Sequence, residues 1–258
     1  LAAAAFAFVM MGPAEQLHAQ PQAKDGKAKA KAGPTRIKTT VVAQGLDHPW
    51  SVAWLPNGDM LVTERPGRVR LVHDGVLDPT PISGVPKVHA VRLSGLMEVL
   101  PHPNFAQNHL VYVSYPKNGP KGNTLAISRG RLEGDKLTEL AEIFVADAWE
   151  TSGNLAGHMT FGKDNTLYVM VGDRDRLCCT GSEDNSLRMK AQALDNHVGK
   201  TLRLTDIGGV PADNPFVGKA GAKPEIFTYG HRNGYGLSIH PQTGEMWQAE
   251  IGPMGGDE

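Results

Sequence analysis

The sequence has few cysteines, little net charge and no long apolar run, and each shortage excludes a class of protein. Its two cysteines, Cys178 and Cys179, are adjacent and lack the CxxC or His-rich spacing that is typical of a zinc site. Acidic and basic residues are interspersed and sum to a net charge of -1, which argues against nucleic acid or an anionic membrane as partner. A neutral small molecule is the better expectation for a substrate.

The N-terminal apolar run, Leu1 to Met11, is too short to span a bilayer. Its composition predicts that residues 1–19 are the remnant of a secretory signal, with an apolar tail or membrane anchor as the alternative. Residues 20–34 are rich in Ala, Lys and Pro and are predicted to be a disordered linker. The mature protein is therefore expected to be periplasmic or secreted, without an integral membrane span. In such an oxidising compartment Cys178 and Cys179 could form a strained disulfide, and two reduced thiols are the alternative.

Residues 35–258 are expected to form one domain built from a repeated β-hairpin phrase. Each copy has an apolar run, a turn and a second run with β-forming residues. The copies begin at Ala53, Glu98, Met159 and Leu237. This spacing, with insertions, is typical of propeller blades. The sequence predicts an all-β propeller with about four blades.

Further strands are expected between these hairpins, and helical periodicity is scarce. Two of them are Gly67 to Val72 and Gly199 to Leu204. One exception to the strand pattern, Ser186 to Asn196, predicts a short helix inside a long insertion. The helix does not change the expected all-β class.

Two C-terminal motifs suggest a family. They are Tyr229-Gly230-His231-Arg232-Asn233 and Glu250-Ile251-Gly252-Pro253, the second followed by Asp257-Glu258. Together with Leu100 to Asn108 and Val210 to Phe216, they resemble the soluble quinoprotein glucose/sorbosone dehydrogenases. The resemblance implies a six-bladed propeller that oxidises an aldose with pyrroloquinoline quinone (PQQ) and calcium. It also suggests that the chain is a C-terminally truncated fragment.

The resemblance assigns roles to several residues. Arg232 and Asn233 match residues beside PQQ, where a guanidinium can hold a carboxylate through two hydrogen bonds. Gly252 and Pro253 match a pair that binds the cofactor calcium through backbone oxygens, which suit this hard cation. The acidic pair Asp257 and Glu258 matches ligands of a second, structural calcium.

The loop Gly172-Asp173-Arg174-Asp175-Arg176 carries alternating charges. Such a pattern is most simply interpreted as a self-paired, solvated loop. Arg174 or Arg176 is the further candidate for a PQQ-binding cation. His197 and Lys200, which come before the next strand, are expected to be structural.

The general base is where the sequence departs from the family. Asn154 occupies the position of the family's catalytic His, and Leu93 that of a Gln near the cofactor. An Asn side chain cannot accept a proton at neutral pH. His158, which titrates in the useful range, is the nearest candidate for a relocated base, although a hydrogen-bonded structural role is the alternative.

Three functions follow from these observations. The first is a PQQ- and calcium-dependent dehydrogenase for an aldose or related alcohol, which would pass electrons to a periplasmic acceptor. The second is a non-redox propeller that binds a sugar or a protein and has lost its base. A calcium-dependent hydrolase such as a lactonase ranks last, because no separate carboxylate cluster is found in the sequence.

Overall fold

A computed structural model describes residues 38–90, 94–151, 153–175 and 185–252. Contacts divide the chain into two units, residues 1–40 and 41–258, and the described part of the first unit, Lys38–Thr40, has no helix or strand. The predictions for residues 1–34, Leu93, the adjacent cysteines and Arg176 lie outside the described residues. Pro253, Asp257 and Glu258 also lie outside them.

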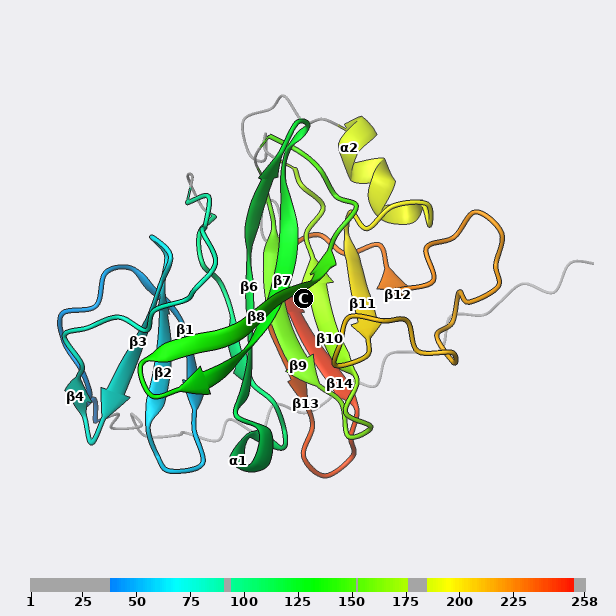
Figure 1. Cartoon of the computed structure of the whole chain (residues 1–258). Coiled ribbons are helices and arrows are strands. Elements are labelled where there is room, and N and C mark those ends of the chain that lie inside the picture. The colour runs from blue at the N-terminus through cyan, green and yellow to red at the C-terminus, as the bar shows by residue number, and fades with distance from the viewer. Residues whose placement is uncertain (1–37, 91–93, 152, 176–184, 253–258) are drawn as a thin grey trace, which may run out of the picture. The chain divides into compact units, whose positions relative to one another are not determined.

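Four antiparallel sheets follow one another along the chain, and we call them blades 1 to 4 (Figure 1). Blade 1 comprises β1 (Pro49–Trp54), β2 (Met60–Glu64), β3 (Arg68–His73) and β4 (Val76–Leu77). Blade 2 comprises β5 (Val99–Pro101), β6 (Leu110–Gly119), β7 (Gly122–Glu133) and β8 (Lys136–Val145). Blade 3 comprises β9 (Ala156–Phe161), β10 (Leu167–Val171), β11 (Lys200–Leu204) and β12 (Ile226–Tyr229). Blade 4 is described as the pair β13 (Gly234–Ile239) and β14 (Met246–Glu250).

The four predicted hairpins are confirmed as the first two strands of the four blades. In blade 1 the turn closes where the Leu55 amide donates to the Asp59 carbonyl at 2.8 Å, and Asn57 donates to the Asp59 carboxylate at the same distance. Such Asn side chains favour turns because they bond to nearby groups. The first strands of successive blades pack together, β1 against β5 and β9 against β13. This arrangement is the all-β propeller that the sequence predicts.

Helices are few and short in the described part of the chain. They are α1 (Phe105–Asn108), α2 (Asn185–Met189) and the 3-10 helix η1 (Lys190–Gln192). The predicted helix in the insertion is confirmed but ends earlier, because Ala193 adopts an extended backbone. None of the described helices is long and apolar enough to cross a membrane.

The hydrophobic core lies between the blades. One cluster fills the space between blades 2 and 3, with Tyr112, Ile127 and Leu202 fully buried. A second cluster joins blades 1 and 2 through Leu61 and Val113. Because both faces of these sheets are covered, β2 and β11 are buried along their whole lengths.

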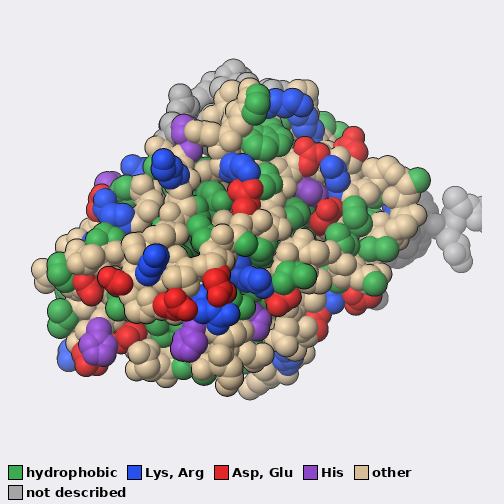
Figure 2. All heavy atoms as spheres, in the orientation of Figure 1, with side chains coloured by type: hydrophobic (Ala, Val, Ile, Leu, Met, Phe, Trp, Pro, Cys, Tyr) green, Lys and Arg blue, Asp and Glu red, His purple; other side chains and the backbone are tan. Residues whose placement is uncertain are grey.

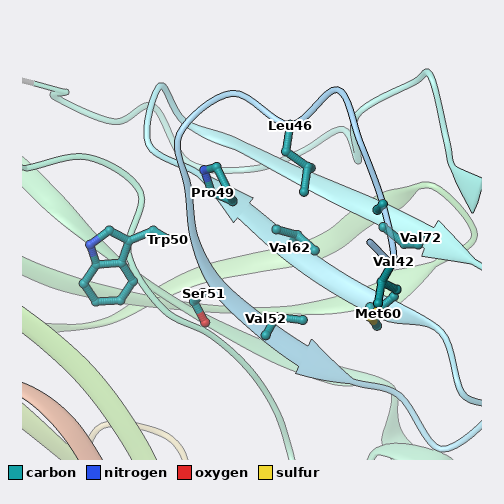
Figure 3. Close-up of a pocket in the computed structure, with 10 residues that line it drawn as sticks. Val42, Leu46, Pro49, Trp50, Ser51, Val52, Met60, Val62 and Val72 are labelled. Carbon is teal, nitrogen blue, oxygen red and sulfur yellow. The ribbon is translucent and has the colours of Figure 1, made fainter. Parts of the chain in front are cut away.

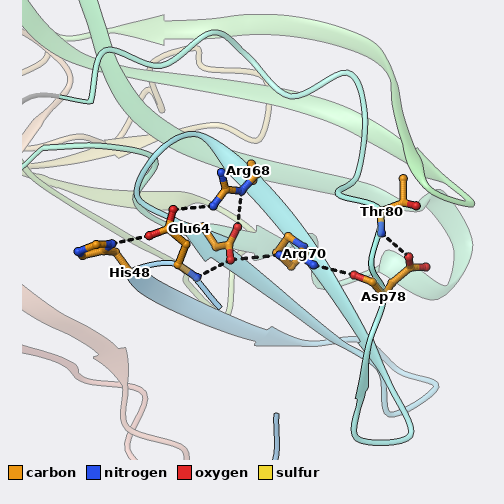
Figure 4. Close-up of polar contacts among 7 residues, drawn as sticks. His48, Glu64, Arg68, Arg70, Asp78 and Thr80 are labelled. Carbon is orange, nitrogen blue, oxygen red and sulfur yellow. Dashed lines mark hydrogen bonds and ion pairs between the residues drawn. The ribbon is translucent and has the colours of Figure 1, made fainter. Parts of the chain in front are cut away.

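A charged network closes the end of β2 (Figure 4). The fully buried Glu64 accepts hydrogen bonds from the Asp47 amide, from Arg68 and, at 3.2 Å, from Arg70. Burial alone would raise the pKa of Glu64, but these donors outweigh it and lower that pKa. Arg70 also donates to the Asp78 carbonyl at 2.7 Å, so the network joins three segments of blade 1.

The outer surface is mixed in charge, and positive and negative side chains alternate over the face in Figure 2. Blade 1 also carries an apolar groove of about 320 Å³, in which Leu46, Val62 and Val72 face one another (Figure 3). Val52 at its edge is 53% exposed.

Candidate functional site

A narrow crevice forms where the first strands of the blades begin. It is lined by Trp50 of β1, Tyr235 of β13, the segment before β5 and the entry to β9. The lining residues are Trp50, Ser94, Met97, Gly153, Asn154, Leu155, Ala156 and Tyr235. Asn154, at the position of the family's base, therefore lies in the wall of this crevice.

Two glycines bring the entry of β9 against the end of β10. A Cβ on Gly153 would lie 2.3 Å from the Arg174 carbonyl oxygen, and one on Gly172 would lie 2.4 Å from that of Asn154. Contacts this short are not tolerated, so glycine is required at both positions. The close approach places Asn154 directly beside Asp173.

Asn154 is held by Asp173. Its Nδ2 donates a hydrogen bond of 2.9 Å to Asp173 Oδ1, and its carbonyl accepts one from the Arg174 amide at 3.2 Å. The same carboxylate oxygen also accepts the Asp175 amide at 3.0 Å. Burial is the main cause that raises the pKa of Asp173 above its ordinary value, although these hydrogen bonds and Arg232 act against it.

The interpretation of the charged loop as self-paired and solvated is wrong. Asp173, Arg174 and Asp175 are all buried, and the strongest partners of their side chains come from elsewhere in the chain. Asp175 accepts two hydrogen bonds from Arg188 of α2, at 2.7 and 3.0 Å. The loop is enclosed because the insertion with α2 contributes this counter-charge.

Arg174 is the largest fully buried side chain among the described residues. Its Nη2 donates to Asn123 Oδ1 at 2.6 Å and approaches the carbonyls of Asn123 and Glu150 at 3.3 Å. Burial lowers the pKa of Arg174 to about 10. Its Nε and Nη1 have no hydrogen-bond partner in the described structure, so the guanidinium keeps unused donors.

The motif Arg232-Asn233 lies between blades 3 and 4. Arg232 Nη1 donates to the Ile251 carbonyl at 2.6 Å, while its Nε is enclosed without a partner among the described residues. The amide oxygen of Asn233 accepts the Ala156 amide at 3.1 Å. The structure thus brings Arg232 and Asn233 to the entry of β9, beside Asn154.

Glu250 fixes the backbone of this motif. One of its carboxylate oxygens accepts the Arg232 amide at 2.7 Å, and the other contacts His231 Nδ1. Burial would raise the pKa of Glu250, but His231 and the Arg232 amide together lower it. His231 is bonded in turn to Thr228 at 2.7 Å, so Glu250 and His231 form a structural support for Arg232.

The candidate calcium ligands are only partly described. Gly252 is half-buried and follows Ile251, whose amide donates to the Asn233 carbonyl at 3.1 Å. This bond places the predicted carbonyl ligand next to the Arg232-Asn233 motif. In the described ranges, no group of three or more His, Cys, Asp or Glu side chains could hold a metal.

His158 lies on β9 but does not line the crevice. Its Nδ1 is 2.6 Å from Glu98 Oε2, and its ring stacks on Trp50 with centroids 4.6 Å apart. Tyr235 meets it edge-on at 6.1 Å. Ser51 donates to the other oxygen of Glu98 at 2.6 Å, so His158 belongs to a packed layer that joins four blades.

The two residues that were expected to be structural are enclosed. His197 accepts the Asp147 amide at 2.9 Å, and Lys200 donates to three backbone carbonyls, including that of Val198 at 2.6 Å. Burial lowers the pKa of Lys200 to about 8. Neither side chain lines the crevice.

Sequence reasoning missed Trp50, Tyr235 and the position of Asp173. The two aromatic residues occupy the second positions of the first strands β1 and β13. That shared place in the repeat was a signal that could have indicated a common layer. Asp173 lies two residues after the buried end of β10, but no local pattern shows that its partner would be Asn154.

The fold and the crevice define the class of protein: a β-propeller with a polar site at the entry to its first strands. A family model described as Glucose / Sorbosone dehydrogenase matches residues 46–258. The chain therefore belongs to the glucose/sorbosone dehydrogenase family.

Two relatives that are named as sugar dehydrogenases agree with this assignment. The chain is 38% identical over 232 residues to aldose sugar dehydrogenase YliI of Escherichia coli, covering 88% of this chain and 60% of the relative. It is 27% identical to quinoprotein glucose dehydrogenase B of Acinetobacter calcoaceticus, covering 89% of this chain and 51% of the relative. The chain thus spans a little over half the length of these relatives.

A solved structure supports the same fold. The PQQ-bound aldose sugar dehydrogenase of Streptomyces coelicolor matches with a TM-score of 0.65 and 27% identity, covering 83% of this chain and 59% of that one. The all-β propeller class is confirmed, with the four blades described here.

Proposed function

We propose that this chain is part of a PQQ- and calcium-dependent dehydrogenase that oxidises an aldose sugar or a related alcohol. The observation that carries the proposal is the half-buried Arg232 guanidinium, whose enclosed Nε has no partner among the described residues. An unused cationic donor beside Asn233 suits a cofactor carboxylate, because such charge-assisted bonds are strong. Two relatives, a quinoprotein glucose dehydrogenase and a PQQ-bound aldose sugar dehydrogenase, support this choice of cofactor.

The residues that would hold PQQ are Arg232 and Asn233, with Arg174 as a further cation. The quinone would supply the site that receives a hydride from the sugar carbon. Gly252 and Pro253 would offer backbone oxygens to the cofactor calcium, and Asp257 and Glu258 would hold a second calcium. This donor set, carbonyls and carboxylates, suits a hard cation.

The test is a titration of the intact protein with PQQ, with and without calcium. Quinone absorbance reports binding, and reduction of a dye with a panel of aldoses reports turnover. We expect calcium-dependent binding followed by sugar-dependent reduction. Folded protein that binds no PQQ would contradict the proposal.

A second candidate function is favoured by Asn154. Because its amide cannot take a proton, the propeller could bind a sugar or a protein without redox chemistry. In that case the titration would give sugar binding with no dye reduction.

The expected location is periplasmic or secreted, and a periplasmic electron acceptor would reoxidise the cofactor in the enzyme.

A further inference from the structure

The proposed dehydrogenase needs a group that takes the proton of the sugar hydroxyl, and the residue at the expected position cannot do so. Asn154 lies in the crevice wall, but its side chain is a neutral amide. The acceptor must therefore be a basic group that reaches the same place. The following inference rests on the proposed function.

Asp173 is the carboxylate in direct contact with Asn154. Its Oδ1 accepts the Asn154 amide at 2.9 Å and the Asp175 backbone amide at 3.0 Å. Its Oδ2 accepts no hydrogen bond from any described residue. This oxygen is also not one of the fully buried atoms without a partner, so it is not sealed from its surroundings. One oxygen thus anchors the carboxylate, and the other is left as an acceptor.

The backbone links Asp173 to the cofactor motif. Its amide donates to the Arg232 carbonyl at 2.6 Å, and the amide of Ala156 donates to Asn233 at 3.1 Å. These bonds place the carboxylate, Asn154 and the predicted cofactor residues in one rigid network. A base must be held at such a fixed distance from the reacting centre to be effective.

The surroundings of Asp173 favour its protonated form more than those of an ordinary aspartate do, because they raise its pKa. The residue is 3% exposed, and this burial is the largest influence on its pKa, which it raises. Asp175 acts in the same direction, although Arg188 largely neutralises it. Arg232 opposes the rise, and Arg174 is the other cation that interacts with Asp173. Enzymes commonly tune carboxylate bases in this way.

We propose that Asp173 is the proton acceptor of this chain, in place of the His that relatives carry at the position of Asn154. The sugar hydroxyl gives its proton to Asp173 Oδ2, and the hydrogen on the same carbon leaves as a hydride to the ortho-quinone cofactor. The C–H and O–H bonds break and a C=O bond forms. The sugar loses two electrons and the quinone gains them, so the step balances.

His158 is the competing candidate, and its surroundings favour a structural role. Its ring stacks on Trp50 and its Nδ1 is engaged by Glu98 Oε2 at 2.6 Å, whereas Asp173 contacts the Asn154 side chain directly. We expect His158→Gln to retain kcat within about threefold, whereas general base removal costs about 10²- to 10⁴-fold. A His158→Gln loss of that size would overturn the assignment to Asp173.

The main experiment compares Asp173→Asn with Asp175→Asn in the intact protein loaded with PQQ and calcium. Asp175 is the matched control, because its buried carboxylate belongs to the same loop but pairs with Arg188 of α2, and its backbone carbonyl, not its carboxylate, accepts the Asn154 amide at 3.4 Å. We expect Asp173→Asn to lower kcat about 10²- to 10⁴-fold while the PQQ dissociation constant stays within threefold. Asp175→Asn should keep kcat within a few fold.

A gain-of-function variant tests the same geometry. Asn154→His restores an imidazole next to Asp173, which can then orient the ring and stabilise its charged form. We expect a higher kcat and a changed pH profile, and both should disappear in Asn154→His with Asp173→Asn. An equal rate increase in the double variant would count against the proposal.

A readout without cofactor completes the test. Carbon NMR of aspartate carboxyls in the apo protein, assigned with Asp173→Asn, should show Asp173 titrating above the range of ordinary aspartates. Titration in the ordinary range, or full activity of Asp173→Asn, would overturn the inference alone. Failure of the wild-type protein to bind PQQ would instead overturn the proposed function and the reaction with it.

Discussion

Asn154, Asp173 and Arg232 lie at the junction of blades 3 and 4. Each has a different role, because each has different hydrogen-bond partners. Asn154 donates to a carboxylate, Asp173 receives that bond with one oxygen, and Arg232 keeps one enclosed donor unused. A buried polar group without a partner is costly, so an unused donor in a native site points to a ligand. Arg232 is therefore the residue whose replacement should be most visible in cofactor binding.

We predict that Arg232→Lys weakens PQQ binding about tenfold. A lysine can supply the charge but not the planar pair of donors that matches a carboxylate. The measurement is the PQQ dissociation constant from quinone absorbance. The control is Arg131→Lys, because Arg131 is a partly exposed arginine of β7. This substitution should leave the dissociation constant unchanged. Equal constants for wild type and Arg232→Lys would show that Arg232 does not hold the cofactor.

The residue scale also shows where sequence reasoning reached its limit. The Arg232-Asn233 motif was recognisable because its residues are contiguous, and the structure places it beside Asn154. Asp173 was misjudged because alternating charges reveal nothing about burial, and its partner Asn154 lies 19 positions earlier. Pairings of this kind depend on how two strands approach, which local patterns do not encode.

At the scale of elements, the hairpin β9–β10 is tied to β11 by Arg203. This side chain donates to Asp164 at 2.6 Å and to Thr166 at 3.1 Å, both next to the hairpin turn. It also reaches Asp213 at 2.8 Å in the long connection before β12. The strands were predictable from the repeat, but this cross-connection was not, because the partners lie far apart in sequence.

We predict a pH-dependent contribution of Asp164 to stability. Burial alone would raise its pKa, but Arg203 and Thr166 lower it to about 2, below the ordinary 3.8. Because the folded-state pKa is the lower one, the stabilisation is complete above about pH 4 and is lost as the pH falls towards 2. Urea unfolding across this range should show a smaller pH dependence for Asp164→Asn than for wild type. The exposed Asp135→Asn should behave like wild type, and identical slopes for all three would refute the prediction.

At the scale of the whole molecule, the blades are joined by apolar clusters and by a few buried polar links. The repeated phrase predicted the four hairpins and the all-β class, because it encodes the alternation of strands and turns. It did not predict the links between blades, because the partner of each linking residue lies in a neighbouring sheet and not in the same repeat. Arg174 is the clearest of these links, connecting the end of β10 with Asn123 of β7.

We predict that Arg174→Ala lowers the free energy of unfolding by about 3 kcal/mol, because it leaves a cavity and orphans the Asn123 amide oxygen. Arg174→Met should cost only about 1 kcal/mol, because the methionine side chain fills most of the space. It also removes a buried charge that has no hydrogen-bonded carboxylate partner in the described structure. Urea denaturation measures both. A larger loss for Arg174→Met than for Arg174→Ala would show that the charge itself holds the blades. PQQ titration of the same variants tests Arg174 as a cofactor cation.

The bonds from Asp173 to Arg232 and from Ala156 to Asn233 cross between consecutive blades. Half of the proposed chemistry is therefore carried by blade 3 and half by the loop that starts blade 4. An engineer who recombines relatives could exchange blade 1 or blade 2 as a unit and leave this pair intact. A crossover between residues 173 and 232 would instead take Asp173 from one relative and Arg232 from another. Such hybrids should fold but have a low kcat.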